Sequence, residues 1–306
     1  MLHKLFLISL MFASLPGMAQ VLDTMYFDQN WEQTTKSESH YYRYISIDTS
    51  GDIRFFVEDY FGGGQIQMTG TYKSIRPDDK DGHFIYYYED GGKQMECYYR
   101  DNILHGPLRE WYPTGQAESF QEFSGGVLDG EFTSWREDGS KKLNARYHGG
   151  TKHGNFHSFY PNGQMVRNDY FENDRLVEGK CFSPEGEPLE YFPYVKMPEF
   201  PGGQPALYKF VEKELKYPHE AKKNNFEGAV LILFTIDEEG YVRDPRVVNG
   251  NRDSFNNEAI RVVNSFPRWN PGEVDGIASP GLKSVAWLTK VSSAPGYSDS
   301  VLANLY

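Results

Sequence analysis

The C-terminal part of the chain contains the stretch that decides its fold, Met197 to Gly276, which reads MPEFPGGQPALYKFVEKELKYPHEAKKNNFEGAVLILFTIDEEGYVRDPRVVNGNRDSFNNEAIRVVNSFPRWNPGEVDG. Pro205 suits the first turn of a helix, where its missing N–H is not needed. Pro218 ends that helix, because the residue before a proline is pushed towards extended geometry. Between the two prolines, apolar residues recur on one helical face: Leu207, Phe210, Val211 and Leu215.

A hairpin and a second helix follow this first helix. The run from Ala229 to Ile236 is apolar at both alternating positions, which is typical of a central strand. A turn at 237–240 and a second strand from Tyr241 to Val248 complete the hairpin. Asp253 or Ser254 can then cap a helix that ends at Pro267. Its buried stripe is predicted to be Phe255, Ala259, Ile260, Val262, Val263 and Phe266.

Several short motifs occur in this stretch in a fixed order. They are Pro201-Gly202-Gly203, Tyr217-Pro218 with Ala221, Phe226-Glu227-Gly228, Asp237 with Gly240, Glu258-Ala259, and Phe266-Pro267-Arg268-Trp269 with Pro271-Gly272. At these residues, and over about 197–291, the chain resembles the C-terminal domain of the TonB family. The resemblance implies two helices on a small antiparallel sheet. It also implies a domain that grips a short peptide of outer-membrane receptors and passes on force from an inner-membrane motor. An unrelated small α+β domain is the alternative.

The middle of the chain repeats with a period of 24 residues. Glycine recurs at 82, 106, 130 and 154, and a second glycine follows nine residues after each, at 91, 115, 139 and 163. An aromatic residue follows 17 residues after each first glycine: Tyr99, Phe123, Tyr147 and Phe171. A fixed period of this size indicates a repeat array, and each unit reads as strand, turn, strand. We therefore expect an elongated array of hairpins that stabilise one another by stacking.

The repeat pattern resembles MORN-type repeats, in the variant also seen in YwqK-like antitoxin proteins, over about residues 55–190. In such proteins the array is a scaffold or contact surface. The predicted fold class is therefore an all-β hairpin repeat array followed by a small α+β domain. The predicted divisions are a signal peptide (1–19), a divergent β segment (20–81), repeats (82–192), a TonB C-terminal-like domain (193–291) and a tail (292–306). Residues 190–204, rich in proline and glycine, are the predicted linker.

Composition and the N-terminus bear on location. The first 19 residues combine a Lys-bearing start, a short apolar core and Ala19 before Gln20, which predicts a cleaved signal peptide. An uncleaved anchor is the alternative. We expect an exported, periplasmic protein, with association with either membrane left open. The net charge of −12 argues against a nucleic-acid partner. Cys97 and Cys181 lie several units apart, so no disulfide between them is expected.

No motif for catalysis, phosphate binding or metal binding is present. His105 and His153 share one repeat position with Asp129, so we interpret them as polar turn residues rather than metal ligands. The acidic residues lie at turns rather than in a cleft. The residues Tyr87, Trp111, Trp135 and Phe159, five after each first glycine, are interpreted as a core stripe rather than a sugar-stacking surface. We expect no enzyme activity, no cofactor and no metal.

The predicted binding site follows from the family resemblance. In that family the turn at Tyr217-Pro218 lies beside the edge at which a receptor peptide adds as a strand, a mode called β-augmentation. The residues assigned to binding are Tyr217, Pro218, His219, Ala221, Lys283, Val285, Trp287, Thr289 and Val291. The alternative for Tyr217-Pro218 is that these residues only end the helix. The alternative for Lys283 and Lys290 is that they only protect the edge strand from pairing.

The chain departs from force-transducing TonB proteins in several respects. Those proteins keep an N-terminal membrane helix and a proline-rich spacer, whereas this chain has a signal-like segment and a repeat array. The first hypothesis is therefore a non-enzymatic cell-envelope interaction protein whose partner is a peptide of a TonB-dependent outer-membrane transporter. The array would be a scaffold or contact surface for another envelope protein. The second hypothesis is a membrane-anchored energy transducer, and the third is an envelope polysaccharide-binding protein or hydrolase.

Overall fold

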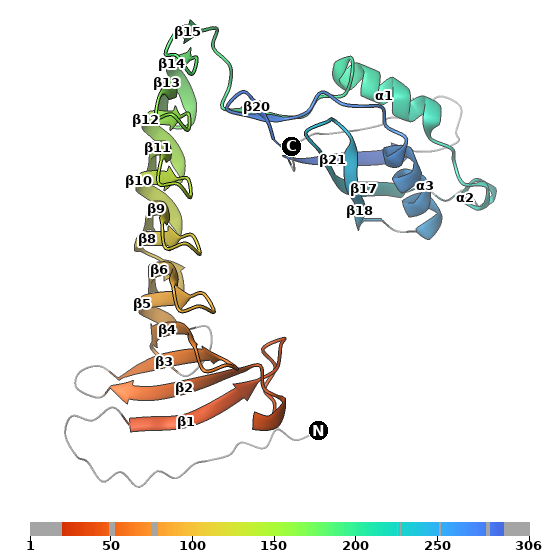
Figure 1. The fold of residues 1–306 in the computed structure, drawn as a ribbon. Helices are drawn as coiled ribbons and strands as arrows, with labels where there is room; N and C mark the ends of the chain where they lie inside the picture. Colours follow the sequence, from red (N-terminus) through yellow and green to blue (C-terminus); the bar gives the residue numbers. More distant parts are fainter. Residues whose placement is uncertain are drawn as a thin grey trace. The chain divides into compact units, whose positions relative to one another are not determined.

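The computed structural model describes residues 20–48, 53–74, 79–224, 226, 228–250, 252–279 and 282–290. The chain forms two compact units, one ending at Glu190 and the other beginning at Tyr191. Figure 1 shows a sheet of strands in the first unit, and helices packed on a small sheet in the second. The predicted signal peptide (1–19) and tail (292–306) lie outside the described residues.

The first unit is one antiparallel sheet whose strand order follows the chain. Each strand pairs with the next one along the sequence, except that the short β7 pairs with β6 beside β8. At about 4.8 Å per strand, the sheet extends over roughly 60 Å. The strands are β1 (Gln20–Phe27), β2 (Tyr41–Asp48), β3 (Arg54–Phe61), β4 (Ile66–Tyr72), β5 (Lys80–Tyr87), β6 (Lys93–Arg100), β7 (Ile103–Leu104), β8 (Gly106–Trp111), β9 (Ala117–Ser124), β10 (Val127–Trp135), β11 (Lys141–His148), β12 (Thr151–Phe159), β13 (Met165–Glu172), β14 (Arg175–Phe182) and β15 (Pro188–Leu189).

The predicted hairpin array is confirmed, and the 24-residue period has a direct structural meaning. In every unit the first glycine pairs across the hairpin with the aromatic residue 17 positions later. These pairs are Gly82–Tyr99, Gly106–Phe123, Gly130–Tyr147 and Gly154–Phe171. All four glycines have positive φ, between 92° and 133°. A side chain is strained in that region of backbone space, which explains why the position is glycine.

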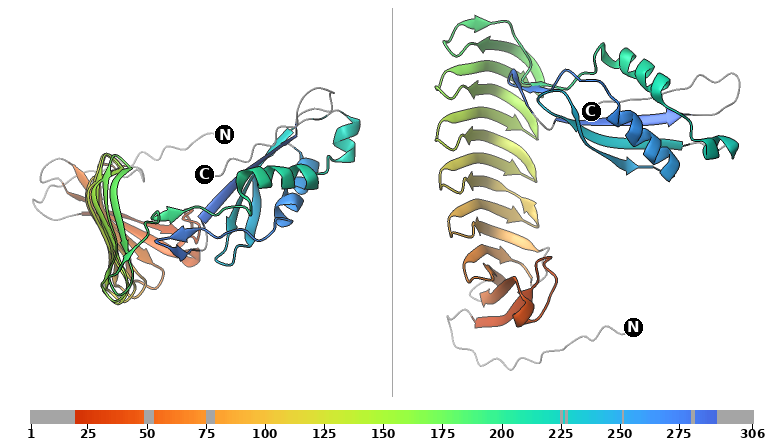
Figure 2. Two further views of the ribbon diagram at one scale, coloured as in Figure 1. Left: turned by 90° about the horizontal axis from the view of Figure 1, so that it is seen from above. Right: turned by 45° about the vertical axis from the view of Figure 1, so that its right-hand side comes forward.

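Two hydrogen-bond ladders join successive units. One runs along two-residue turns with positive φ at both positions: Asp101-Asn102, Gly125-Gly126, Gly149-Gly150 and Asn173-Asp174. The second residue of each turn donates its N–H to a carbonyl of the preceding unit: Lys80, Leu104, Leu128 and Lys152. The other ladder runs from side chains to the carbonyls of the next unit: Tyr88 to Trp111, Tyr112 to Trp135, Arg136 to Phe159 and Tyr160 to Phe182. Stacking thus stabilises each hairpin through its neighbours. Figure 2 shows these hairpins stacked one upon another.

The divergent segment continues the same sheet. Strands β1 to β4 precede β5 without a break in strand order, and the strands predicted around residues 48–51 are β2 and β3. Side chains on one face of β2 to β8 form a continuous core: Ile45, Val57, Met68, Tyr72, Phe84, Cys97 and Leu108. The predicted stripe at Tyr87, Trp111, Trp135 and Phe159 is half-buried, outside the fully buried core. The stripe lies beside the side-chain ladder, because the main-chain carbonyls of Trp111, Trp135 and Phe159 accept three of the hydrogen bonds of that ladder.

The second unit has the predicted α+β fold. Its main sheet has the order β18-β17-β21, formed by β17 (Gly228–Ile236), β18 (Val242–Asn249) and β21 (Leu282–Lys290). A second sheet has the order β16-β19-β20, formed by β16 (Val195–Lys196), β19 (Glu273–Val274) and β20 (Ile277–Ala278). The helices are α1 (Gly203–Glu214), the short α2 (His219–Lys223) and α3 (Asp253–Asn264). The sequence analysis did not anticipate α2.

One core joins the helices to β17. Buried residues of α1 and α3 pack in the same cluster as alternate residues of β17, so both helices cover one face of the sheet. The cluster contains Leu207, Val211, Val230, Ile232, Phe234, Ile236, Phe255, Ala259, Val262 and Val263. The predicted linker is partly ordered into this unit, because Phe200 is buried and Glu199 exchanges two backbone hydrogen bonds with Asn270.

Candidate functional site

The β18-β17-β21 sheet of the second unit has two edge strands, β18 and β21, which differ in how regularly they pair with β17. The central strand β17 pairs on both sides, with β18 and with β21. An edge strand offers unpaired N–H and C=O groups to which another chain can pair.

The β18 edge is irregular. Its pairing with β17 shifts register twice, which marks bulges. The strand contains Pro245, which has no N–H to donate, and Asp244 has a φ of 49°. Arg243, Asp244 and Arg246 add charge along the same strand. Bulges, proline and charge are the features with which proteins protect an edge from pairing.

The β21 edge is regular. All nine residues of β21 pair with β17 without a shift in register, from Gly228–Lys290 to Ile236–Leu282. The strand contains neither proline nor glycine. Among the described residues β21 pairs with β17 alone, so its other side is an edge. An edge strand of this length with unbroken register is a suitable template for β-augmentation.

A small cavity of about 30 Å³ lies at one end of this sheet. It lies between the segment that joins α1 to α2, the start of α3, and the first residues of β17, Gly228 and Val230. These two residues pair with Lys290 and Leu288 of β21. Tyr217 and Pro218 line the cavity, and the Tyr217 ring meets Phe255 edge-on at 5.6 Å. The cavity thus lies at the end of the sheet where β17 begins and its partner β21 ends.

Glu258 of α3 holds the segment that carries Tyr217 and Pro218. Its carboxylate accepts the main-chain N–H of Lys216 at 2.6 Å and two hydrogen bonds from Arg261, at 2.7 and 2.8 Å. Arg261 also donates to the carbonyl of Glu214. Burial raises the pKa of Glu258, but the hydrogen bonds from Arg261 and Lys216 outweigh burial and hold that pKa below its ordinary value. The segment is thus fixed to α3 by a charged cluster.

The predicted site residues fall into distinct environments. Tyr217 donates its hydroxyl to the carbonyl of Phe226 and, with Pro218, lines the cavity. His219 is exposed and begins α2. Ala221 is 1% exposed and packs in the core, so it positions the segment and offers no surface to a peptide. Lys283, Val285, Trp287 and Thr289 belong to β21, and Val291 lies outside the described residues.

Several residues around the cavity were missed by the sequence analysis. Leu215, Lys216, Phe255 and Glu258 line it together with the predicted Tyr217 and Pro218. Glu258 belongs to one of the motifs that carry the resemblance, and Phe255 to the predicted helical stripe, so both signals were present. What the sequence did not reveal was that residues about 40 positions apart meet, as Lys216 and Glu258 do with a separation of 42.

In the described part of the chain, no three His, Cys, Asp or Glu side chains converge in a way that could hold a metal ion. The histidines at repeat positions make local contacts, such as His148 with Asp129 at 2.9 Å. No helix in the described ranges has the length and apolar composition needed to cross a membrane.

Comparison with known proteins agrees with the geometry of the second unit. No curated protein shows a significant match to the chain. Residues 213–282 match the family model of the Gram-negative bacterial TonB protein C-terminal. The matched range begins near the end of α1 and stops at the first residue of β21. That family is a non-enzymatic protein-interaction domain associated with the Gram-negative envelope. The second unit is therefore TonB-like in sequence and in its fold of helices on an antiparallel sheet.

Proposed function

We propose that the protein is a non-enzymatic interaction protein of the cell envelope, and that its second unit binds an extended peptide of a TonB-dependent outer-membrane transporter. The peptide pairs as an added strand with β21. Main-chain hydrogen bonds supply affinity in this mode, and neighbouring side chains supply selectivity. The residues assigned to contact with the peptide are Tyr217, Pro218 and His219 together with β21.

The contrast between the two sheet edges carries this proposal. β18 has Pro245 and two register shifts, whereas β21 pairs over nine residues without irregularity. Charged residues occur in both strands, as Lys283 and Lys290 in β21, so the contrast rests on proline and register. A protein under pressure only to avoid edge pairing would be expected to protect both edges. Leaving one edge regular favours a partner strand there.

The cavity beside Tyr217 supports a role in selecting the peptide. At about 30 Å³ it has room for roughly one water-sized group. Its wall is mostly apolar, with Leu215, Pro218, Val230 and Phe255. A small apolar tip of a peptide side chain is the group that fits such a space.

Paired proline substitutions test the edge. Neighbouring residues of a strand direct their N–H groups to opposite sides of the strand. One of the two variants Ser284→Pro and Val285→Pro therefore removes an N–H that bonds to β17. The other removes an N–H that points away from β17, to the open edge. The outward member should fold and bind a fluorescent receptor N-terminal peptide more weakly in an anisotropy titration. The controls are Val247→Pro and Val248→Pro in β18. Whichever of these two variants folds should bind the peptide with unchanged affinity. Unchanged affinity in the folded β21 variant would contradict the proposal.

The first unit is proposed to act as a MORN-like scaffold or contact surface for another envelope protein. Its regular stacking of hairpins favours a rigid, extended role. Export to the periplasm is part of the same proposal and rests on the signal-like residues 1–19. N-terminal sequencing of the protein from its native envelope tests this part. A start at Gln20 supports export with cleavage, whereas a start at Met1 favours the membrane-anchored transducer.

A further inference from the structure

A cleft of about 570 Å³ lies among strands β2 to β6 of the first unit, near the N-terminal end of the array. Its volume is in the range of small-molecule sites. The side chains that give it its character are Trp31, Arg43, Asp59, Tyr72, Lys80 and Tyr86. The cleft belongs to a different unit from the β21 edge, so it goes beyond the function proposed above.

The floor of the cleft is a row of residues paired across neighbouring strands. Arg43 pairs with Asp59, Asp59 with Met68, and Met68 with Tyr86. Residues directly opposite each other on adjacent strands share a face of the sheet. The next row on this face belongs mostly to the buried core and consists of Ile45, Val57, Gly70 and Phe84. The cleft therefore stands on rigid, paired strands rather than on loops.

Trp31 is held at the rim in an unusual conformation. Its φ is 62°, a region that a bulky residue rarely adopts. The turn that presents it is closed by Asp28, whose side chain accepts the N–H groups of Asn30 and Glu32 at 2.8 and 3.0 Å. The Trp31 ring stacks on Tyr41, with centroids 4.7 Å apart, yet 39% of Trp31 stays exposed. Backbone strain maintained at an exposed tryptophan is a signature of a functional position.

The charges in the cleft balance. Arg43 donates two hydrogen bonds to Asp59, at 2.6 and 2.8 Å, and both side chains are largely buried. Lys80 donates to the hydroxyl of Tyr86 at 3.0 Å. Among the described residues, the remaining charged side chain in the lining is that of Glu89. The described lining thus contains two cationic and two anionic side chains, whose formal charges cancel.

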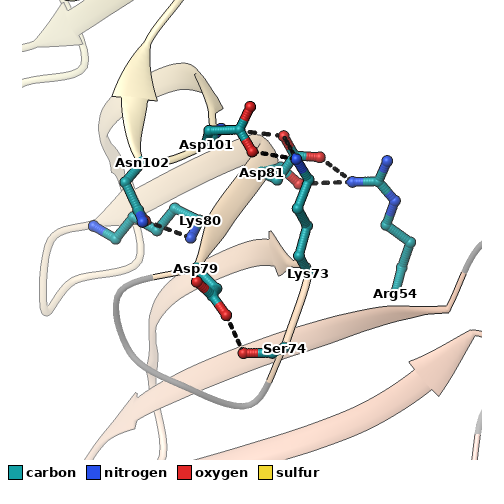
Figure 3. Close-up of polar contacts among 8 residues, drawn as sticks. All are labelled: Arg54, Lys73, Ser74, Asp79, Lys80, Asp81, Asp101 and Asn102. Carbon is teal, nitrogen blue, oxygen red and sulfur yellow. Dashed lines mark hydrogen bonds and ion pairs between the residues drawn. The ribbon is translucent and has the colours of Figure 1, made fainter.

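Lys80 is also fixed through its backbone. Its N–H donates to the side chain of Asn102 at 2.6 Å, and its carbonyl accepts the N–H of Asn102 at 2.9 Å. Figure 3 shows this contact beside the cluster in which Arg54 and Lys73 approach Asp81, with Lys73 also reaching Asp101. The first inter-unit turn therefore positions a residue that lines the cleft.

We propose that this cleft binds a neutral oligosaccharide. The C–H face of a pyranose ring packs on aromatic faces, whose π-systems carry partial negative charge. Each sugar hydroxyl both donates and accepts, as do the phenol of Tyr86 and the amides of Gln67 and Gln94 that also line the cleft. An anionic ligand would need a cation that is free to bind it. Arg43 is already paired with Asp59, and the Lys80 ammonium donates to the Tyr86 hydroxyl and lies 4.9–5.8 Å from the ring centroids of Phe84, Tyr86 and Tyr99. A purely apolar ligand would leave these polar groups unpaired.

Isothermal titration of the purified full-length protein tests the proposal. The probes are hexasaccharides of four neutral kinds, maltohexaose, cellohexaose, mannohexaose and chitohexaose, with hexagalacturonate as the anionic comparison. At least one neutral probe should bind at up to millimolar concentration. Trp31→Ala should weaken that binding by about tenfold or more, because it removes one aromatic side chain on which the sugar packs. Trp111→Ala, at a tryptophan outside the cleft, should change it less than about twofold. Tyr86→Phe, which removes one hydroxyl, should also weaken it.

The controls separate this proposal from the one above. Circular dichroism and the melting temperature of each variant show whether it is folded. The receptor-peptide affinity of Trp31→Ala should equal that of the unchanged protein, because β21 lies in the other unit. The oligosaccharide proposal is overturned if no neutral probe binds, if only hexagalacturonate binds, or if folded Trp31→Ala and Trp111→Ala lose affinity equally. None of these results would bear on peptide binding by β21.

Discussion

The main-chain N–H of Lys216 donates a 2.6 Å hydrogen bond to the carboxylate of Glu258, which lies 42 residues later in the sequence. This bond ties the residue before Tyr217 to α3. The carboxylate of Glu258 thus helps to hold Tyr217 and Pro218 in place beside α3. Since these two residues line the cavity at the end of the sheet where β17 begins and β21 ends, the same bond links helix packing to the proposed binding site.

Replacement of Glu258 by Gln should loosen this segment in a pH-dependent way. The pKa of folded Glu258 lies below its ordinary value, so its carboxylate stabilises the fold above about pH 4.3. That stabilisation is lost as the pH falls through the folded pKa. At pH 7, Glu258→Gln should lower the free energy of local opening of residues 215–218 by about 1–2 kcal/mol. The difference from the unchanged protein should shrink towards pH 3.5, as measured by hydrogen exchange and mass spectrometry.

Glu238→Gln provides the control, because Glu238 is an exposed turn residue. Its exchange should match that of the unchanged protein at both pH values. Equal protection of residues 215–218 in Glu258→Gln and the unchanged protein at pH 7 would show that the bond to Lys216 does not hold the segment.

Loss of one rung of the side-chain ladder should weaken the array measurably. Tyr88 donates its hydroxyl to the carbonyl of Trp111 at 2.8 Å, and Tyr112 donates to Trp135 at 3.0 Å. Tyr88→Phe should lower the free energy of unfolding of the first unit by about 1 kcal/mol. Tyr98→Phe is the matched control, since Tyr98 is exposed and its ring stacks on His83. Urea unfolding followed by circular dichroism compares the two, and equal midpoints would argue against the ladder.

Gly70 should not tolerate a side chain. A Cβ atom at this position would lie 2.2 Å from Cε1 of the buried Phe84. Gly70→Ala should therefore cost about 1–3 kcal/mol, the usual range for overpacking. The double variant Gly70→Ala/Phe84→Leu should lose less than the sum of the two single variants, because the leucine leaves room. Gly92→Ala, whose nearest neighbour is the flexible Asp90 side chain at 3.2 Å, is the control. Additive losses in urea unfolding would mean that the two residues do not compete for space.

Cys97 and Cys181 are both buried thiols on separate strands of the array, β6 and β14. Burial raises the pKa of Cys97 to about 11, which further lowers its reactivity. Iodoacetamide at pH 8 should label neither residue in the folded protein within minutes. In guanidinium without reductant it should label both. Labelling of fewer than two thiols in the unfolded protein would reveal a disulfide or another modification.

Local patterns in the sequence were enough to predict the array and the α+β domain. The 24-residue period marks positions where the backbone needs glycine, as at Gly82 and Gly130, and such a requirement recurs wherever the unit recurs. The hairpin of β17 and β18 follows from its apolar run and its turn. The use of an open sheet edge near Lys283 to Val291 came from the family resemblance rather than from a local pattern.

Features that depend on contacts between distant residues were not predicted. The four two-residue turns have different sequences, Asp-Asn, Gly-Gly, Gly-Gly and Asn-Asp, so they do not stand out as a repeat although their conformation is the same. Strands β1 to β4 fall outside the exact 24-residue period, with only a fainter copy at Gly64 and Tyr72, and they join the sheet by pairing in register with their neighbours. The cleft around Arg43 and Asp59 and the bond from Lys216 to Glu258 likewise require the folded chain.

Backbone NMR of the full-length protein, titrated with a receptor N-terminal peptide, tests the central claim most directly. If the peptide adds as a strand to β21, the largest amide shifts should fall in residues 282–290 and around 215–219. Residues of β18, at the protected edge, should shift little. A peptide of the same composition in scrambled order is the control. Shifts confined to β18 or to the repeat array, or none at millimolar peptide, would contradict binding at the β21 edge.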